Sequence, residues 1–391
     1  MLQTLAISGY RSVRDLVMPL AGLTVVTGAN GVGKSNVYRA LKLISELGRD
    51  GAISTLAREG GLGSATWAGP EAGTRARGNG ERRSAQGTVR REAVALKLGF
   101  ATDDYGYTVD LGLPRPDLDP RDPSMFGLDP IIKTESIFHG ALLRPSTTMV
   151  KRSGPLVQVR AQSTLDDVGL RLADWESVLS MLDATTAPEA GMLRRELTAW
   201  RFYDALRTDA QSPARSEQIG TRTPVLASDG SDVAAAIRTI HEQSDPQPFH
   251  EAIAAAFDGA RVQVRADEHG RFGLLLQQPG LLRPLSAAEL SDGTLRYILL
   301  ATALLSVHPA PLLVLNEPEN SLHPQLLEPL GALIAEASER SQIVVVSHAK
   351  ALVDSLTQHG ALRHELLKDG GETVIDEQGI FDRPAWAWPK R

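Results

Sequence analysis

The chain has 391 residues, of which 42% are hydrophobic and 23% are charged, a composition typical of a water-soluble protein with two or three structural units. It contains no cysteine, which excludes disulfide bonds and thiolate metal sites and suits a reducing compartment. The formal net charge of −6 argues against a wholly basic nucleic-acid binder, although it leaves room for a local basic patch.

Two segments bear on membrane association, and neither supports it. The N-terminal residues MLQTLAISGYRSVRD lack an apolar run long enough for a signal peptide. Tyr297 to Leu315 carries no charge and is long enough to span a bilayer, but Pro309 and Pro311 interrupt it. We therefore predict a helix, a break and a buried strand here, no membrane contact and a cytoplasmic protein.

The first elements of the chain lead to a glycine-rich motif. Leu2 to Ser8 and Val13 to Leu20 have the apolar pattern of two strands, and Leu23 to Val26 predicts a third, buried strand. The sequence TGANGVGKSN follows, from Thr27 to Asn36. The fixed positions of G-x-x-x-x-G-K-[ST] are filled by Gly28, Gly33, Lys34 and Ser35.

This motif has the chemistry of a phosphate-binding loop. Glycines let successive backbone N–H groups surround phosphate oxygens, and the following helix N-terminus adds partial positive charge. Lys34 would reach the β- and γ-phosphates, and Ser35 would ligate Mg²⁺. The alternative is a glycine-rich turn without a ligand. The residues assigned to nucleotide binding are Gly28, Ala29, Asn30, Gly31, Val32, Gly33, Lys34, Ser35 and Asn36.

A loop rich in arginine follows the next helix. Val37 to Leu47 has apolar residues at helical spacing, and Gly48 marks its end. Glu59 to Gln86 has little periodicity and predicts a loop. Residues 74–92 hold six arginines and two glutamates, a local net charge of +4. A solvated loop and contact with a phosphate backbone both remain open.

A long insertion separates this motif from later ones. Alternating runs predict an antiparallel sheet with strands at Val94 to Phe100, Tyr107 to Leu113, Ile131 to Phe138 and Leu156 to Val159. Helical spacing predicts helices at Trp175 to Leu182, Leu193 to Leu206, Val233 to Ile240 and Phe249 to Phe257. We expect one α/β head formed by residues 1–60 and 260–391. The insertion, residues 61–259, would comprise a β part (about 88–160) and a helical lobe (about 165–258).

Three motifs complete the chain after a predicted hairpin, Arg261 to Ala266 with Phe272 to Gln277. LSDGTLR, Leu290 to Arg296, opens a helix. Leu312 to Leu315 is a buried strand ending in Asn316-Glu317, and QIVVVSHAK is another that ends in Ser347-His348. We expect Asn316-Glu317 and the phosphate-binding loop at the carboxyl ends of neighbouring strands.

The order GANGVGKSN, LSDGTLR, LLVLNEPENSLHP and VVVSHA resembles the ATP-binding-cassette type AAA ATPases of the RecF, SMC and overcoming-lysogenization-defect group. The start, ISGYRSVRDL, is similar to their first strand and turn. The resemblance covers Met1 to about Leu47 and about Ala260 to Leu367. It implies a P-loop NTPase head with an antiparallel β lobe and a helical insertion, and a head-to-tail dimer with two ATP molecules between the subunits.

The resemblance also implies roles for single residues. Glu317 would be the general base, His348 the switch residue at the γ-phosphate, and Lys34 a catalytic cation. Ser291, Asp292 and Gly293 would form the signature that completes the partner subunit's site. Asn320, Leu322 and His323 match the loop that crosses the dimer interface. Arg11 is a candidate for nucleotide contact, and Gln158 and Gln162 are candidates for the glutamine between the lobes.

Two of these roles have simpler alternatives, and one position departs from the family. Glu317 could be a surface acid and His348 a satisfied core histidine. Asn316, assigned with Ser35 to Mg²⁺, stands where many of these ATPases have aspartate. An amide oxygen can bond a Mg²⁺-bound water but adds no negative charge, so slow turnover or weak magnesium affinity is expected.

The resemblance implies two functions. The first is an ATPase, with ATP and Mg²⁺, whose ATP-driven homodimer acts on DNA in repair or maintenance, in the cytoplasm and at the nucleoid. The alternative is a nucleotide-sensing subunit that regulates a partner effector, for example in phage defence. We expect no Toprim nuclease domain, because the chain ends soon after the last predicted strand.

Overall fold

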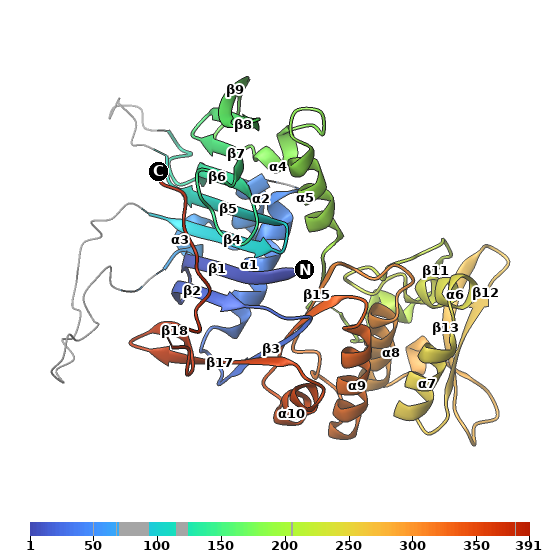
Figure 1. The fold of residues 1–391 in the computed structure, drawn as a ribbon. Helices are drawn as coiled ribbons and strands as arrows, with labels where there is room; N and C mark the ends of the chain where they lie inside the picture. Colours follow the sequence, from blue (N-terminus) through green and yellow to red (C-terminus); the bar gives the residue numbers. More distant parts are fainter. Residues whose placement is uncertain (50, 68, 70–93, 115–123, 205, 380) are drawn as a thin grey trace. The chain divides into compact units, whose positions relative to one another are not determined.

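The computed structural model describes residues 1–49, 51–67, 69, 94–114, 124–204, 206–379 and 381–391 (Figure 1). The arginine-rich loop at 74–92 lies outside the described residues. Contacts group the chain into two compact units. Unit 1 comprises Met1–Leu20, Gly28–Ala199 and Glu365–Arg391, and unit 2 comprises Ala21–Thr27 and Trp200–His364. The expected division into a head and an insertion stays a prediction; by contacts, residues 94–199 group with the P-loop helix and residues 200–259 with the later motifs.

Unit 1 contains an eight-stranded antiparallel sheet in the order β2-β1-β4-β5-β6-β7-β8-β9. The strands are β1 (Leu2–Tyr10), β2 (Val13–Pro19), β4 (Leu96–Thr102), β5 (Tyr105–Gly112), β6 (Ile131–His139), β7 (Thr148–Ser153), β8 (Leu156–Ala161) and β9 (Thr164–Arg171). The antiparallel sheet was predicted, but β7 and β9 were missed. Both carry charged residues, and β9 is exposed along most of its length, so neither has a clear apolar alternation.

The helices of unit 1 are α1 (Lys34–Leu47), α2 (Gly51–Arg58), α3 (Leu62–Ala65), α4 (Val178–Met181) and α5 (Pro188–Ala199). Helix α1 buries Val37, Leu41 and Ile44 at helical spacing, as predicted. The predicted helix at Trp175 to Leu182 is reduced to the single turn α4. The predicted helix at Leu193 to Leu206 is wrong in its second half, because Arg201–Tyr203 forms strand β10. Pairing with β15 outweighs the helical pattern there.

Unit 2 is built on a parallel sheet in the order β10-β15-β16-β3. Strands β15 (Leu312–Asn316) and β16 (Gln342–Val346) are almost wholly buried, as is β3 (Leu23–Gly28) before the chain passes into unit 1. In the register Val346 lies opposite both Asn316 and Val26. Strand β16 therefore lies between β3 and β15, which corrects the expectation that these two are direct neighbours. Their carboxyl ends still lie at one edge.

Helices and a small sheet complete unit 2. The helices are α6 (Val233–Gln243), α7 (Gln247–Ala256), α8 (Asp292–Leu304), α9 (Leu327–Ala337) and α10 (Lys350–Gln358), with 3-10 turns η1 (Pro213–Arg215), η2 (Ala287–Glu289) and η3 (Pro324–Leu326). The small sheet has the order β11 (Gln218–Ile219), β13 (Arg271–Gln277), β12 (Arg261–Ala266), and β14 (Leu285–Ser286) pairs with β13. The predicted hairpin is thus confirmed as β12 and β13.

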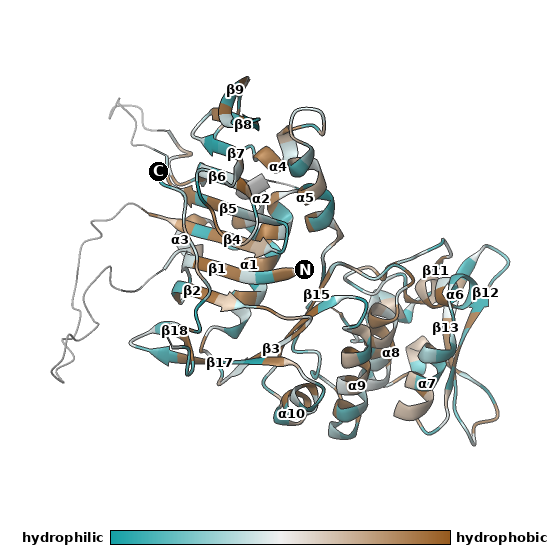
Figure 2. Cartoon of the chain, in the orientation of Figure 1, coloured by the Kyte–Doolittle hydropathy of each residue, from teal (hydrophilic) through white to brown (hydrophobic). Residues whose placement is uncertain are grey.

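The uncharged segment Tyr297–Leu315 forms the end of α8, a break and β15, as predicted. Figure 2 shows α8 as largely apolar, and its residues Leu295, Ile298 and Leu299 are fully buried in the core of unit 2. Within the part of the chain that is described, no helix has both the length and the apolar composition needed to cross a bilayer.

The last hairpin belongs to unit 1. Strand β17 (Leu362–Asp369) enters that unit at Glu365, and β18 (Glu372–Ile375) pairs with it in antiparallel register. Thr373 in β18 is fully buried. This hairpin therefore supplies unit 1 with a buried polar side chain from the far end of the sequence.

Candidate functional site

The phosphate-binding loop in unit 1 requires glycine at two closely packed positions. Gly28 and Gly33 have φ of 139° and 107°. A Cβ on Gly28 would lie 2.4 Å from the Leu366 carbonyl oxygen, and one on Gly33 would lie 2.3 Å from Thr373 Oγ1. Gly31 also has a positive φ, of 80°, but faces open space. The chain then turns directly into α1 at Lys34.

Lys34 folds back over this loop. Its ammonium group donates to the carbonyl oxygens of Gly28, at 2.8 Å, and Ala29, at 3.0 Å. The side chain is buried, whereas Ser35 beside it is exposed. The first turn of α1 holds no acidic residue, so the partial positive charge of the helix terminus is not neutralised locally.

Two polar side chains from distant parts of the sequence fix the loop from outside. Thr373 Oγ1 donates to the Val32 carbonyl oxygen at 2.7 Å and lies 2.7 Å from Ser12 Oγ. Asn36 Nδ2 donates to the same Ser12 oxygen at 2.8 Å, and Thr373 N donates to the Ser12 carbonyl at 2.8 Å. Neither Thr373 nor Ser12 was assigned a role from the sequence, because no local motif points to a contact of this range.

Arg11, the candidate for nucleotide contact, is engaged within unit 1. Its guanidinium forms an ion pair with Glu59 at 3.0 Å, and Tyr10 donates its hydroxyl to the same carboxylate oxygen at 2.6 Å. Burial, followed by the Glu59 hydrogen bond and charge, raises the pKa of Tyr10. Arg11 has a positive φ of 49°, which makes this turn a strained position for a non-glycine residue.

In unit 2, Glu317 follows β15 in an unusual backbone conformation. Its φ is 47°, and its N–H donates to the Val346 carbonyl oxygen at 2.8 Å, which continues the pairing of β15 with β16. The carboxylate is 36% exposed and accepts a hydrogen bond from Asn320 Nδ2 at 3.0 Å. Asn316, the preceding residue, is half-buried. Backbone pairing therefore fixes the main chain of Glu317, while its carboxylate stays accessible to solvent.

His348 lies beside two carboxylates. Its Nδ1 is 3.7 Å from Glu317 Oε1 and 3.3 Å from Glu319 Oε1, and the imidazole is 43% exposed. The structure thus brings His348 and Glu317 together and adds Glu319, which the sequence analysis did not assign. Glu319 is the second acidic residue of the sequence NEPEN, and the sequence pattern gives no indication that this residue is buried.

Arg296, the last residue of the LSDGTLR motif, connects α8 to this cluster. Its guanidinium donates to the carbonyl oxygens of Leu206, at 2.8 Å, and Glu317, at 3.2 Å. Burial lowers the pKa of Arg296, and the charges of Glu319 and Glu317 oppose that shift. Because Arg296 lies in the first turns of α8 and binds the backbone of Glu317, this helix helps to hold the candidate base in place.

The signature residues occupy the N-terminus of α8. Ser291 caps the helix, since its Oγ accepts from Thr294 N at 3.2 Å. Asp292 forms an ion pair with Arg215 at 2.7 Å. Gly293 packs against the loop after β15, where an added Cβ would lie 2.7 Å from the Ser321 carbonyl oxygen. A larger residue at this position would displace that loop.

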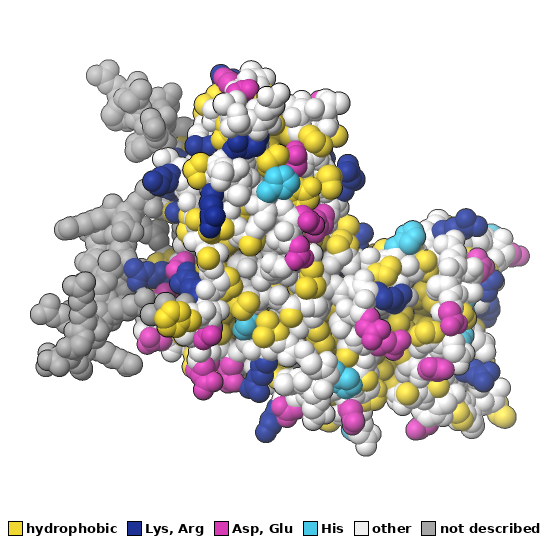
Figure 3. Space-filling view, viewed as in Figure 1, with side chains coloured by type: hydrophobic (Ala, Val, Ile, Leu, Met, Phe, Trp, Pro, Cys, Tyr) yellow, Lys and Arg dark blue, Asp and Glu magenta, His cyan; other side chains and the backbone are white. Residues whose placement is uncertain are grey.

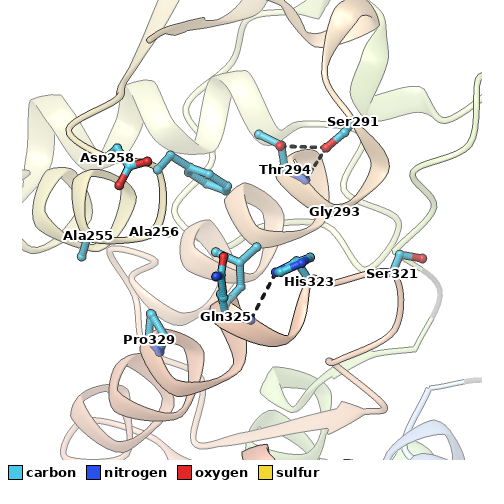
Figure 4. A pocket seen from close by; sticks show the side chains of 12 residues that line it. Ala255, Ala256, Asp258, Ser291, Gly293, Thr294, Ser321, His323, Gln325 and Pro329 are labelled. Atoms are coloured by element: carbon cyan, nitrogen blue, oxygen red, sulfur yellow. Dashed lines mark hydrogen bonds between the residues drawn. The ribbon is translucent and has the colours of Figure 1, made fainter. Parts of the chain in front are cut away.

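A cavity of about 560 Å³ lies beside this helix terminus, entirely within unit 2 (Figure 4). Ser321, with φ of 65°, and His323 line it from the predicted interface loop, and η3 follows. Signature residues and the interface loop thus share one surface, as Figure 4 shows. The remaining lining residues lie at and just after the end of α7, at the start of α8, in η3 and in α9: Ala255, Ala256, Phe257, Asp258, Ser291, Gly293, Thr294, Gln325, Leu326 and Pro329.

The candidate residues therefore form three groups, each described within its own unit. Unit 1 holds the phosphate-binding loop with Ser12 and Thr373. Unit 2 holds Glu317, Glu319 and His348 beside Asn316, and separately the signature with the interface loop. Gln158 and Gln162 lie in and directly after β8, where Gln158 Nε2 donates to the Leu165 carbonyl at 3.5 Å. The functional roles of these residues remain predictions.

The parallel core with its phosphate-binding loop and the large antiparallel sheet define a P-loop fold of the ATP-binding-cassette type. The chain belongs to the family described as "AAA domain, putative AbiEii toxin, Type IV TA system", whose model matches residues 23–145 and 161–354. The predicted resemblance to the AAA family is confirmed by this match. No curated protein matches the sequence.

Solved SMC heads have the same fold over nearly the whole chain. A structure of an SMC head bound to the C-winged helix domain of ScpA has a TM-score of 0.51 at 14% identity, covering 97% of this chain and 98% of its own. The SMC head domain from Thermotoga maritima has a TM-score of 0.47 at 14% identity, covering 97% and 99% of the two chains. At this identity the first of these supports the fold alone.

The packing of the loop predicts different costs at two of its glycines. Gly33→Ala should lower the free energy of unfolding by about 1–3 kcal/mol more than Gly31→Ala, because only Gly33 meets Thr373 and Ser12. Both positions have positive φ, so Gly31→Ala controls for backbone strain. Urea unfolding of the three proteins measures the difference. Equal losses would show that the contacts of Ser12 and Thr373 do not constrain the loop.

Proposed function

We propose that this chain binds and hydrolyses ATP and that ATP binding joins two copies head to tail. The proposal rests on one observation, that the polar side chains of the candidate site fall into three sets. One set surrounds the phosphate-binding loop in unit 1. In unit 2 a second set lies at Glu317 and His348, and a third, the signature, borders a cavity whose lining includes neither of these two residues. Such a signature is useful only if it completes another subunit's site.

The phosphate-binding loop supports nucleotide binding directly. Its glycine conformations expose backbone N–H groups, and Lys34 is already held over the loop by two carbonyl oxygens, from which it can turn to a phosphate. Ser35 and Asn316 would hold Mg²⁺, and their hydroxyl and amide oxygens suit a hard cation. Both ligands are neutral, so the phosphates of ATP would supply the negative charge at the metal.

Glu317 is the proposed general base. Its backbone is fixed by Val346 and Arg296, while its partly exposed carboxylate can accept a proton from water at Oε1 or Oε2. His348, held beside it, would contact the γ-phosphate. Neutral Asn316 in place of an aspartate predicts slow turnover.

Coupling to DNA is the first candidate for the biological role, in repair or maintenance at the nucleoid within the cytoplasm. The fold shared with SMC heads and the +4 charge at residues 74–92 support it. On the face shown in Figure 3, basic and acidic side chains of the described residues are interspersed.

A nucleotide-sensing subunit that regulates a partner effector is the second candidate. The description of the family as a toxin of a toxin–antitoxin system favours it. The similar SMC head was solved with a domain of ScpA, which supports a partner protein for this chain as well. In this role ATP-dependent dimerisation would be the signal, and slow hydrolysis would set how long it lasts.

Removing the lysine of the loop should abolish tight nucleotide binding. Lys34→Ala is expected to raise the Kd for Mg·ATP roughly 10- to 150-fold, because a charged hydrogen bond to the phosphates is lost. Titration calorimetry measures this affinity. Lys42→Ala, which removes a charge from the same helix where it lies over the Tyr38 ring, should leave it unchanged. Equal affinities of Lys34→Ala and the unmodified protein would contradict the proposed site.

The proposed dimer makes opposite predictions for two variants. Glu317→Gln should slow hydrolysis about 10²- to 10⁴-fold and accumulate an ATP-bound dimer, because the amide keeps the shape but accepts no proton. Ser291→Arg should bind ATP but stay monomeric. Light scattering with saturating Mg·ATP measures both masses. A monomeric Glu317→Gln would refute the proposed arrangement.

A mixture of two inactive variants tests whether the site is shared. Lys34→Ala and Ser291→Arg should each be inactive alone, yet a mixed dimer has one site with both faults and one intact. Partial ATPase activity should return on mixing if a single intact site turns over. A mixture as inactive as its components, with mixed dimers shown to form, would argue against sites completed in trans.

The ATPase rate with linear, nicked and single-stranded DNA separates the two roles. A DNA-linked enzyme should be stimulated by one of them, and its DNA affinity should fall by about 0.9 log units per phosphate contact for each log unit of salt. Replacing Arg75, Arg77, Arg82 and Arg83 with alanine should flatten that slope. An ATPase indifferent to all three DNA forms would favour the regulatory role.

A further inference from the structure

Glu319 is a buried carboxylate at the candidate site that has no role in the mechanism proposed above. It lies two residues after Glu317, and its side chain is 6% exposed whereas that of Glu317 is 36% exposed. Burying a carboxylate is costly unless its oxygens are hydrogen-bonded. The hydrogen bonds of Glu319 therefore indicate which groups the buried carboxylate holds in place.

Among the described residues, Glu319 accepts hydrogen bonds through only one of its carboxylate oxygens. Oε1 accepts from Ser347 Oγ at 2.7 Å, from His348 N at 3.0 Å and from Ala349 N at 3.2 Å. The same oxygen lies 3.3 Å from His348 Nδ1. The other oxygen, Oε2, is buried and has no hydrogen-bond partner among the described residues. All these contacts converge on the residue proposed to act as the switch.

The contact with Nδ1 has a consequence for the imidazole. The two atoms lie at ion-pair distance, and a carboxylate charge this close favours the tautomer with hydrogen on Nδ1, because a lone pair there would oppose the negative charge. Glu317 Oε1, 3.7 Å from the same nitrogen, adds to this effect. The neutral ring then has its lone pair on Nε2, the nitrogen turned away from the two acids.

We propose that Glu319 is a positioning residue that fixes both the ring orientation of His348 and its Nδ1–H tautomer. The three other donors bind the turn that carries His348, and the carboxylate charge selects the proton position on the ring. The competing explanation is a purely structural one, in which Glu319 only ties the turn after β16 to the loop after β15. The meaning of the tautomer for hydrolysis rests on the proposed function, but the tautomer itself does not.

Nitrogen-15 NMR of the full chain, labelled at its histidines, tests the proposal without nucleotide. At alkaline pH, where imidazoles are neutral, the two ring nitrogens distinguish the tautomers by their shifts. His348→Gln assigns the signal among the nine histidines. The unmodified protein should show His348 with hydrogen on Nδ1.

Glu319→Gln keeps the volume and one acceptor oxygen, so it should fold, and it should shift His348 toward the Nε2–H tautomer. Glu319→Leu should complete the shift if that variant folds. Glu317→Gln is the matched control, which removes the more distant charge and should leave the Nδ1–H tautomer dominant. Retention of the original tautomer in Glu319→Gln, even with a lower stability, would overturn the proposal and leave the structural explanation.

The ATPase assay is a separate readout. If the proposed function is right, Glu319→Gln should lower kcat about tenfold with the KM for ATP little changed, because the ring of His348 would lose the charge that orients it. A tautomer shift in a protein without ATPase activity would contradict the proposed function and support the role of Glu319. An altered kcat with an unaltered tautomer would contradict the role of Glu319.

Discussion

The parallel pairing of β16 with both β3 and β15 is the constraint on which the candidate site depends. Val346 lies opposite Val26 on one side and Asn316 on the other. The pairing continues beyond the strands, since Ser347 N donates to the Val26 carbonyl and Glu317 N to the Val346 carbonyl. A slip of one residue in either pairing would turn the following side chains to the other face of the sheet. The positions of Glu317 and His348 thus follow from backbone hydrogen bonds in a buried sheet.

The polar side chains that support the candidate residues come from different elements in each unit. Thr373, Glu319 and Arg296 are buried, and Ser12 is half-buried. In unit 1, Ser12 and Thr373 hold the phosphate-binding loop through its backbone and through Asn36. In unit 2, Glu319 and Arg296 hold the turn of His348 and the backbone of Glu317. Glu317 and His348 remain partly accessible, whereas Glu319 and Arg296, which place them, are buried, an arrangement that limits their conformations without blocking the site.

The sequence alone was enough to predict the elements whose conformation depends on a local residue pattern. The phosphate-binding loop, α1, α8 and strands β15 and β16 each have a motif or an apolar run that does not depend on distant residues. Sequence analysis failed where a contact with a distant part of the chain determines the conformation or the burial of a residue. Arg201–Tyr203 becomes a strand because β15 offers it a partner, and β7 and β9 are strands although their charges hide the alternation. Thr373 and Glu319 could not be assigned because only the fold shows that one touches Val32 and the other is buried.

The hydrogen bond from Thr373 to the Val32 carbonyl joins residues 341 positions apart. A chain leaves the ribosome from its N-terminus at about 5–20 residues per second, so the loop emerges long before the hairpin that holds it. The contact between Thr373 and Val32 can therefore form only after β18 has emerged, so the packing of this early loop depends on a segment that is made much later.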